Sequence, residues 1–318
     1  MSEVTVMPTR LFCTALVFGI AASGASLLQA QQPTFSSESQ VVVLHVAVLD
    51  GREYVGGLEQ HAFHVFENKE PQAVTFFSNQ DAPVTVGLVV DSSGSMGANR
   101  NRVIAAGVGF AENSNPEDDM FVLGFNERVK APFPEDAPFT HDIPTIRGAL
   151  DEAIGARGQS AVYNAVDAGL DYLDRGKYER KVLVLVSDGG DNASGVSRAA
   201  ILSKAAASNA VIYTVGLIDP LESDSDRGFL RQLAEVSGGR FFEPEQVSDV
   251  GKVLRQVARD IRSMYTVGYV PKSPALDKAE LRNVSVEVVL PNGRKAKVRT
   301  RRAYLSGKPS ERRADVGR

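Results

Sequence analysis

The stretch that decides the fold runs from residue 85 to residue 97 and reads Thr-Val-Gly-Leu-Val-Val-Asp-Ser-Ser-Gly-Ser-Met-Gly. Its apolar run, residues 86–90, is typical of a strand that is buried on both faces. The run ends at Asp91, which opens a turn rich in hydroxyl groups and glycine. Because ligands of open α/β sheets bind at the carboxyl ends of strands, this turn is a candidate binding site.

Asp91, Ser93 and Ser95 form an Asp-x-Ser-x-Ser pattern, which brings one carboxylate and two hydroxyls to the same turn. Hard oxygen ligands of this kind suit Mg²⁺ or Mn²⁺, and the pattern has no thiol or imidazole for a softer metal. The same residue types also form ordinary turns, because Asp and Ser bond their own backbone and Gly tolerates positive φ. Taken alone, the pattern favours the ordinary turn, and only partners elsewhere in the chain reverse that interpretation.

Two further segments supply such partners. One is Ser187-Asp188-Gly189-Gly190-Asp191-Asn192, which follows a second apolar run, so another buried strand ends in an acidic turn. The other spans residues 158–165, Gly-Gln-Ser-Ala-Val-Tyr-Asn-Ala, a glycine-led loop that enters a helix. Ser160 is expected near the N-terminus of that helix, where the alternative to a metal ligand is an N-cap, and capping does not exclude contact with a metal.

With these three loops in this order, the chain resembles a von Willebrand factor type A domain and its metal-ion-dependent adhesion site (MIDAS). The resemblance implies that Ser93 and Ser95 bind the metal directly, and that Asp91 and Asp188 bind it directly or through water. Ser160 stands where the family most often has Thr. Because Ser lacks the methyl group that restrains χ1, we expect a competent but less rigid ligand.

The pattern of residues 82–264 alternates strands with helical stretches. It predicts an α/β domain with a Rossmann-like, mostly parallel sheet flanked by helices. The resemblance implies the same fold over roughly the same residues. We expect strands at 85–90, 120–125, 181–187, 210–217 and 240–243, and helices at 99–114, 143–156, 161–174, 196–208, 226–237 and 246–263.

Both flanks of this domain are β-rich and predict one small β-rich module. Residues 31–81 hold short strand-like runs. Residues 265–305 include an alternating stretch, 284–290, which reaches Asn292-Gly293, a strong hairpin signal. The basic residues within 295–302 suggest either an anionic surface ligand or, more commonly, a solvated strand face.

The wider order of segments is similar to that of a group of secreted bacterial proteins with the same type of domain. In that group a β segment precedes the domain and a short phrase with Gly-Tyr follows it. The corresponding phrases here are Phe63-His64-Val65-Phe66-Glu67 and Gly268-Tyr269-Val270-Pro271.

The N-terminal residues, 1–30, have the charged, apolar and small-residue regions of a secretory signal. We expect cleavage after Ala30, with an uncleaved anchor as the alternative. The single cysteine, Cys13, lies in this segment, so the mature chain needs no disulfide. We therefore expect a secreted or periplasmic, extracytoplasmic protein without an integral membrane segment in its mature chain, and a disordered tail over residues 306–318.

The composition of the chain, and the absence of residues that two classes of enzyme require, narrow its possible functions. The formal net charge of −4 gives no reason to expect nucleic acid as a partner. Phosphatases with an Asp nucleophile commonly carry a second Asp two residues later, where this chain has Ser93. The Gly-x-Ser-x-Gly elbow of α/β-hydrolases needs a His after its Ser and acid, whereas all four histidines precede Asp188: His45, His61, His64 and His141. On an expected strand, His61 and His64 would lie on opposite faces and would not share a zinc ion.

These observations predict a binding protein rather than an enzyme. Asp91 and Asp188 would hold Mg²⁺, or else Mn²⁺ or Ca²⁺, and the resemblance implies one position open to a carboxylate of a partner protein. We expect partner contacts from Met96, Asn99, Asp191 and Asn192. One alternative is a structural or assembly scaffold, in which the metal only holds the loops and the β module makes the contacts. A metal-dependent hydrolase is a remote alternative.

Overall fold

The computed structural model describes residues 41–51, 53–155, 157–218, 225–273 and 280–306. These described residues form one compact unit. The predicted signal sequence with Cys13 lies outside the described residues, as does nearly all of the predicted tail. In the described part of the chain no helix has the length and apolar character needed to cross a membrane.

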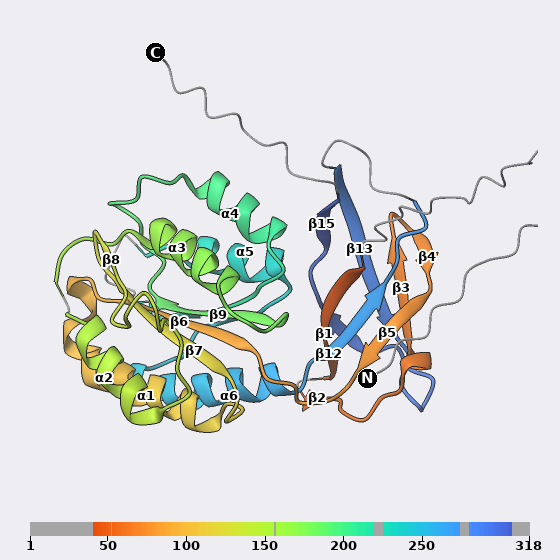
Figure 1. Cartoon of the computed structure of the whole chain (residues 1–318), viewed down its shortest axis with the longest axis horizontal. Helices are drawn as coiled ribbons and strands as arrows, with labels where there is room; N and C mark the ends of the chain where they lie inside the picture. The colour runs from red at the N-terminus through yellow and green to blue at the C-terminus, as the bar shows by residue number, and fades with distance from the viewer. Residues whose placement is uncertain (1–40, 52, 156, 219–224, 274–279, 307–318) are drawn as a thin grey trace, which may run out of the picture. The chain divides into compact units, whose positions relative to one another are not determined.

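A six-stranded, mostly parallel sheet forms the centre of the α/β domain (Figure 1). Its order is β11-β10-β9-β6-β7-β8; β8 is antiparallel to β7, and the other neighbours are parallel. The strands are β6 (Thr85–Asp91), β7 (Asp119–Phe125), β8 (Val129–Lys130), β9 (Lys181–Ser187), β10 (Val211–Gly216) and β11 (Phe241–Phe242). The chain moves from β6 to one side of the sheet and later returns through β9 on the other, so the topological switch point lies between β6 and β9.

Helices cover both faces of this sheet (Figure 1). Leu88 and Val90 of β6 face one core, and Val89 faces the other, as the alternation of strand side chains requires. The helices α1 (Arg100–Asn113), α2 (Ile143–Ala153) and α6 (Val250–Arg262) cover the first face, and α3 (Val162–Asp174), α4 (Arg198–Ala207) and α5 (Arg227–Ser237) cover the second. The predicted fold class is confirmed, and the predicted elements end within a few residues of the observed ones.

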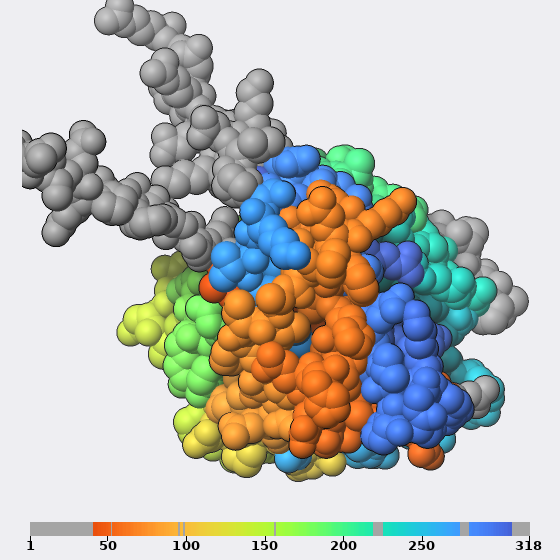
Figure 2. All heavy atoms as spheres, turned by 90° about the vertical axis from the view of Figure 1, so that its right-hand side faces the viewer, coloured from red at the N-terminus to blue at the C-terminus, as the bar shows by residue number. Residues whose placement is uncertain are grey.

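The two flanks form one β module with two sheets, and Figure 2 shows the N-terminal flank in orange beside the C-terminal flank in blue. One sheet has the order β14-β1-β12-β5 with β2 beside β1, and the other has the order β15-β13-β3-β4. The strands are β1 (Val42–Asp50), β2 (Glu53–Tyr54), β3 (Phe63–Glu67), β4 (Glu70–Gln72), β5 (Val74–Ser78), β12 (Tyr265–Tyr269), β13 (Glu280–Val288), β14 (Lys297–Arg299) and β15 (Ala303–Ser306). Because β1 pairs with β12 and β3 pairs with β13, each sheet needs both flanks.

The hairpin expected at Asn292-Gly293 forms over a few residues, since Val289 and Lys295 form an antiparallel bridge and Ala296 donates its N–H to the carbonyl of Val288 at 2.9 Å. Gly293 has φ 79° and donates its N–H to the carbonyl of Leu290. The strand after this turn then leaves β13, since β14 pairs with β1 and β15 takes the place beside β13. The residue types of a turn act locally, whereas strand pairing depends on which side chains become buried. Val298 of β14 packs against the core of the module.

Gly124 of β7 allows a close approach between the sheet and the end of α2. A Cβ atom at this position would lie 2.2 Å from the carbonyl oxygen of Ala153. The approach places the residues after α2 against the first loop of the candidate site. There the Ser92 hydroxyl accepts the N–H of Gly155 at 2.6 Å, and the Ser92 carbonyl accepts the N–H of Arg157 at 2.9 Å.

Buried polar side chains join the α/β domain to the β module. Arg301 donates to the side-chain oxygen of Asn209 at 2.7 Å and to the carbonyl of Val43 at 2.8 Å. His45 of β1 is buried near Arg301 and Arg180. Burial lowers the pKa of His45 to about 3, with a further contribution from the positive charges of the two arginines. His45 is therefore neutral in the folded protein.

Replacing Gly124 with Ala should destabilise the protein. The added methyl group meets backbone atoms of Ala153, so the Gly124→Ala variant should lose about 1–3 kcal/mol of unfolding free energy, as overpacked sites do. Gly148 of α2 is the matched control, since nothing lies within 4 Å of its added Cβ. Gly148→Ala should gain about 0.5–1 kcal/mol because Ala favours the helix. Urea unfolding measures both values, and a Gly124→Ala variant as stable as the wild type would contradict the packing described.

Replacing His45 with Gln should reduce the loss of stability in acid. Because the folded pKa lies below the ordinary value of 6.5, between these two pKa values the unfolded chain binds a proton that the folded chain does not. The unfolding free energy therefore falls as the pH drops below 6.5, by up to about 1.4 kcal/mol per pH unit from this residue. Unfolding curves at neutral pH and about one unit below 6.5 should show a loss roughly 1.4 kcal/mol smaller in His45→Gln. Equal losses in the two proteins would show that His45 can be protonated in the folded state.

Candidate metal centre

Three loops meet at the carboxyl edge of the central sheet, beside its switch point. β6 ends at Asp91, and its parallel neighbour β9 ends at Ser187. The third loop leads into α3, and its Gly158 carbonyl accepts the N–H of Gly94 from the first loop at 3.2 Å. The parallel order of the sheet thus places the loops where the sequence predicted a binding site.

The carboxylate of Asp91 contacts all three loops. Its Oδ1 atom accepts the N–H of Ser93 at 2.8 Å. Its Oδ2 atom accepts the hydroxyl of Ser187 at 2.8 Å and the hydroxyl of Ser160 at 3.3 Å. Asp91 is 0% exposed, so these hydrogen bonds replace water around a buried carboxylate.

The electrostatics around Asp91 lack a compensating cation. Burial raises the pKa of Asp91, hydrogen bonds from Ser93 and Ser187 lower it in part, and the nearby carboxylate of Asp188 raises it again. Among the described residues no Lys, Arg or His forms a salt bridge with Asp91, and none is among the main causes of its pKa shift. Two carboxylates that repel each other in a poorly hydrated place would both be stabilised in ionised form by a divalent cation.

Asp188 is held by the turn that follows β9. It is 8% exposed, and its Oδ1 atom accepts the N–H of Gly190 at 2.9 Å. Gly189 has φ 84°, and a Cβ atom there would lie 2.6 Å from the carbonyl oxygen of Asp226. Only glycine fits this conformation without a clash. The turn therefore directs the chain so that the Asp188 carboxylate lies near that of Asp91.

Asp191 and Asn192, which we expected to contact a partner, are tied to the third loop. The side-chain oxygen of Asn192 accepts the N–H of Ser160 at 2.9 Å, and the carbonyl of Ser160 accepts the N–H of Asn192 at 2.9 Å. Asp191 accepts the N–H of Tyr163 at 3.3 Å and the hydroxyl of Ser194 at 2.6 Å. Both residues thus position Ser160 and the start of α3, and contact with a partner stays a prediction.

The expected contact residues of the first loop differ in their accessibility. The loop contains a short 3-10 helix, η2 (Gly94–Asn99). Met96 is 2% exposed and packs in the core beneath α1, which corrects our expectation of a partner contact. Burying its long apolar side chain is more favourable than exposing it. Asn99 is half-buried at the start of α1. The side chain of Ser95 lies outside what the structure describes, so its role as a ligand stays a prediction.

Sequence reasoning missed two serines that organise the site. The Ser187 hydroxyl donates to Asp91 and accepts the N–H of Gly189 at 3.0 Å. Ser92 donates its N–H to the carbonyl of Phe125 at 2.6 Å and holds the loop after α2. The signal for Ser187 was present, because aligning the two apolar runs as neighbouring strands puts Ser187 beside Asp91.

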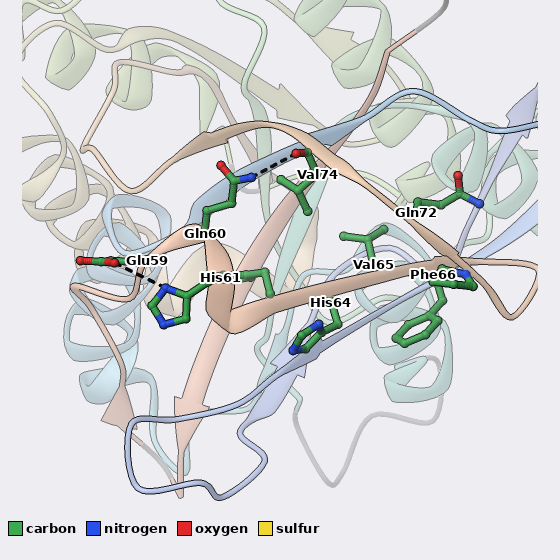
Figure 3. Close-up of a pocket in the computed structure, with 10 residues that line it drawn as sticks. Glu59, Gln60, His61, His64, Val65, Phe66, Gln72 and Val74 are labelled. Carbon is green, nitrogen blue, oxygen red and sulfur yellow. Dashed lines mark hydrogen bonds and ion pairs between the residues drawn. The ribbon is translucent and has the colours of Figure 1, made fainter.

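None of the four histidines lies on the three loops. His45 is in β1, His64 is in β3, and His141 precedes α2. His61 is not on a strand as expected but in a short 3-10 helix, η1 (Gln60–Ala62). His61 and His64 both line a cavity of about 560 Å³ in the β module, shown in Figure 3, where His61 lies 3.4 Å from the exposed carboxylate of Glu59. Over the described ranges no three His, Cys, Asp or Glu residues are grouped to hold a metal, so this cavity lacks such a site.

The donor set around Asp91 fits a hard divalent cation. The described candidates are two carboxylates, Asp91 and Asp188, and two hydroxyls, Ser93 and Ser160, and all four residues are buried. Oxygen donors of this kind suit Mg²⁺, Mn²⁺ or Ca²⁺ better than softer ions. Only two of the donors are charged, so the centre relies on hydroxyl oxygens to complete the coordination.

Several solved structures have a similar fold. Proximal thread matrix protein 1 of the mussel byssus, in a structure with a zinc-occupied MIDAS motif, matches with a TM-score of 0.50 and 18% identity, over 62% of this chain and 50% of that chain. A von Willebrand factor type A protein from Catenulispora acidiphila matches with 0.49 and 14%, over 78% and 74%. The von Willebrand factor domain of a type V pilus tip protein from Porphyromonas gingivalis matches with 0.46 and 13%, over 56% and 95%. At these identities the likeness shows the fold alone.

The sequence itself carries the family assignment. A comparison with curated proteins gives no match. The pattern of the von Willebrand factor type A domain, by contrast, matches residues 85–256, which is more than half of the chain. The match starts at the first residue of β6 and includes all three loops of the candidate centre. The chain therefore belongs to the von Willebrand factor type A domain family.

Proposed function

We propose that the protein binds a partner protein through a divalent cation held at the carboxyl edge of its central sheet. The observation that carries this proposal is the convergence of three loops on the buried carboxylate of Asp91. Membership of the von Willebrand factor type A family supports an interaction module. The zinc-occupied MIDAS motif of the mussel protein supports a metal in the corresponding loops. We propose Mg²⁺ as the ion because the donors are hard oxygens.

The residues of the site would supply two kinds of ligand, charged carboxylates and neutral hydroxyl groups. Asp91 and Asp188 supply the negative charge, and Ser93, Ser95 and Ser160 supply neutral oxygens. The bound cation would supply a coordination position that accepts a carboxylate of the partner. The two carboxylates balance the charge of the ion, and the neutral oxygens add no further negative charge, so the ion stays electron-poor and can accept an acidic side chain from outside.

The rim of the site would give the partner its specificity. Asn99 is half-buried, Asp191 is half-buried and Asn192 is exposed, and all three border the loops. Asn192 also accepts the N–H of Ser160 in a hydrogen bond of 2.9 Å, so a partner that contacts Asn192 would act on the third loop through this bond. From the predicted signal sequence we propose that this contact occurs outside the cytoplasm.

A binding role is favoured over hydrolysis by the groups that surround Asp91. Its described neighbours are hydroxyls, backbone N–H groups and one further carboxylate, and no histidine lies on the three loops. Ser93 occupies the place where a phosphatase of the Asp type carries its proton donor. The described part of the site therefore offers ligands for a metal but no pair of groups suited to general acid and base catalysis.

Removing single ligands should weaken Mg²⁺ binding. Asp91→Asn removes a charge and Ser160→Ala removes a hydroxyl, so each should raise the Kd for Mg²⁺ at least about tenfold, which is roughly 1.4 kcal/mol. Ser160→Thr should bind Mg²⁺ at least as well as the wild type, because it keeps the hydroxyl and restrains χ1.

Calorimetric titration of the full chain with MgCl₂ measures these affinities. The matched control is Asp136→Asn, which should bind as the wild type does; this exposed carboxylate follows Glu135, whose carbonyl accepts a hydrogen bond from Arg175 at the C-terminal end of α3, away from the loops. Circular dichroism verifies that each variant is folded. Unchanged affinity in both Asp91→Asn and Ser160→Ala would refute the metal site.

Partner binding should depend on the metal centre. The wild-type protein and the Asp136→Asn variant, each immobilised, should capture the partner protein from a buffer that contains Mg²⁺ and release it when EDTA is added. The Asp91→Asn variant should not capture it. The reason is that the proposed contact passes from the partner's carboxylate to the cation. Capture of the same protein by all three chains in EDTA would instead support the scaffold alternative, in which the β module makes the contacts.

A further inference from the structure

A basic pocket lies where the turn between α5 and β11 meets β14. Its volume is about 400 Å³. Five cationic side chains line it, together with a single carboxylate, that of Glu235: Arg231, Arg240, Lys297, Arg299 and Arg302. The chain as a whole has a net charge of −4, so this concentration of positive charge is a local feature. Because the turn precedes β11, the pocket lies at the amino edge of the sheet, opposite the candidate metal centre.

Most of these cations are held in place without being neutralised. The guanidinium group of Arg240 lies 4.3 Å from the ring centre of Phe242, and that of Arg231 lies 5.5 Å from the ring centre of Phe241. Aromatic rings orient a guanidinium but leave its hydrogen-bond donors available. Among the described residues none of Arg231, Arg240, Lys297 and Arg302 forms a salt bridge.

The buried carboxylate of Asp260 partly compensates two members of the group, Arg240 and Arg299. One nitrogen of Arg299 lies 3.8 Å from the carboxylate of Asp260, and Arg299 also donates to the hydroxyl of Tyr54. Its Nε atom is buried and makes no hydrogen bond. Arg299 therefore adds positive charge to the pocket lining, although part of its guanidinium group is already engaged by Asp260 and Tyr54.

A tight backbone turn completes the pocket, next to Thr300 of its lining. Gly238 has φ 82°, and a Cβ atom there would lie 2.4 Å from the carbonyl carbon of Thr300. This packing fixes the turn after α5 against the chain that carries Thr300, so the donors lie on a rigid frame.

The structure also separates the basic residues that the sequence grouped together. Lys295 pairs with Glu287 at 2.7 Å and Arg294 pairs with Asp50 at 2.7 Å, as on a solvated strand face. Lys297, Arg299 and Arg302 line the pocket instead. Part of the basic run therefore forms a concave surface, which an ordinary exposed strand face does not provide.

We propose that this pocket binds the phosphate or sulfate group of a small molecule. Guanidinium groups bind such oxyanions through paired hydrogen bonds. The pocket is larger than one phosphate ion, so it has room for a second charged group or for a sugar that carries the first. The site shares no residue with the candidate metal centre, so ligands can occupy the two edges of the sheet separately.

Calorimetric titration of the full chain with inorganic pyrophosphate tests this proposal, in a low-salt buffer that contains no divalent cation. The wild type should bind, and the double variant Lys297→Glu, Arg302→Glu should bind at least about tenfold more weakly, which is roughly 1.4 kcal/mol. Both residues are exposed, so the protein should fold. The control is Arg147→Glu on the exposed side of α2, which packs on β7 towards the other end of the sheet.

Each outcome of this experiment supports or overturns the proposal. Glucose 6-phosphate and a sulfated sugar in place of pyrophosphate show which oxyanion is preferred. Equal affinity in the wild type and the double variant would overturn the site, as would an equal loss in Arg147→Glu, which indicates a general charge effect. No heat of binding at millimolar pyrophosphate, or tighter binding of citrate than of pyrophosphate, would also overturn it.

Discussion

The buried carboxylate of Asp91 is the constraint on which the rest of the site depends. An ionised carboxylate without partners is very unfavourable in a protein interior, so every group around it must supply a hydrogen bond or a positive charge. Ser93, Ser160 and Ser187 supply hydrogen bonds, and each comes from a different loop. The position of this carboxylate follows from the sheet, because β6 has a parallel neighbour on each side and ends at the switch point.

The α/β domain could be predicted because its signals are local. A strand buried on both faces appears as a continuous apolar run, and the three loops carry their own residue types. What the sequence could not show depends on contacts between distant elements. Met96 follows the same turn as Ser93, yet it turns inward because α1 offers apolar neighbours. The Ser187 hydrogen bond to Asp91 depends on the register between β6 and β9. The hydrogen bonds from the third loop to Asp191 and Asn192 likewise join segments that are distant in the sequence.

The β module shows the limit of local signals more clearly. β1 pairs with β12 and β3 with β13 across the whole α/β domain, and nothing near either strand in the sequence identifies its partner. Asn292-Gly293 forms a turn as its residue types require, but the next strand joins the other sheet, where Val298 packs against the core. Because both sheets need both flanks, the module forms only when segments from either side of the α/β domain come together, as β5 and β12 do.

The two edges of the central sheet have opposite electrostatic character. Asp91 and Asp188 lie at the carboxyl edge, and Arg231, Arg240 and Lys297 lie near the amino edge. A strand of seven residues such as β9 separates the edges by roughly 23 Å at about 3.3 Å per residue. Salt at physiological concentration screens charges over about 8 Å, so the field of one edge barely reaches the other. A cation at one edge and an anion at the other would therefore bind without direct electrostatic coupling. Any influence between them would have to pass through the packed strands, whose interior tolerates little displacement.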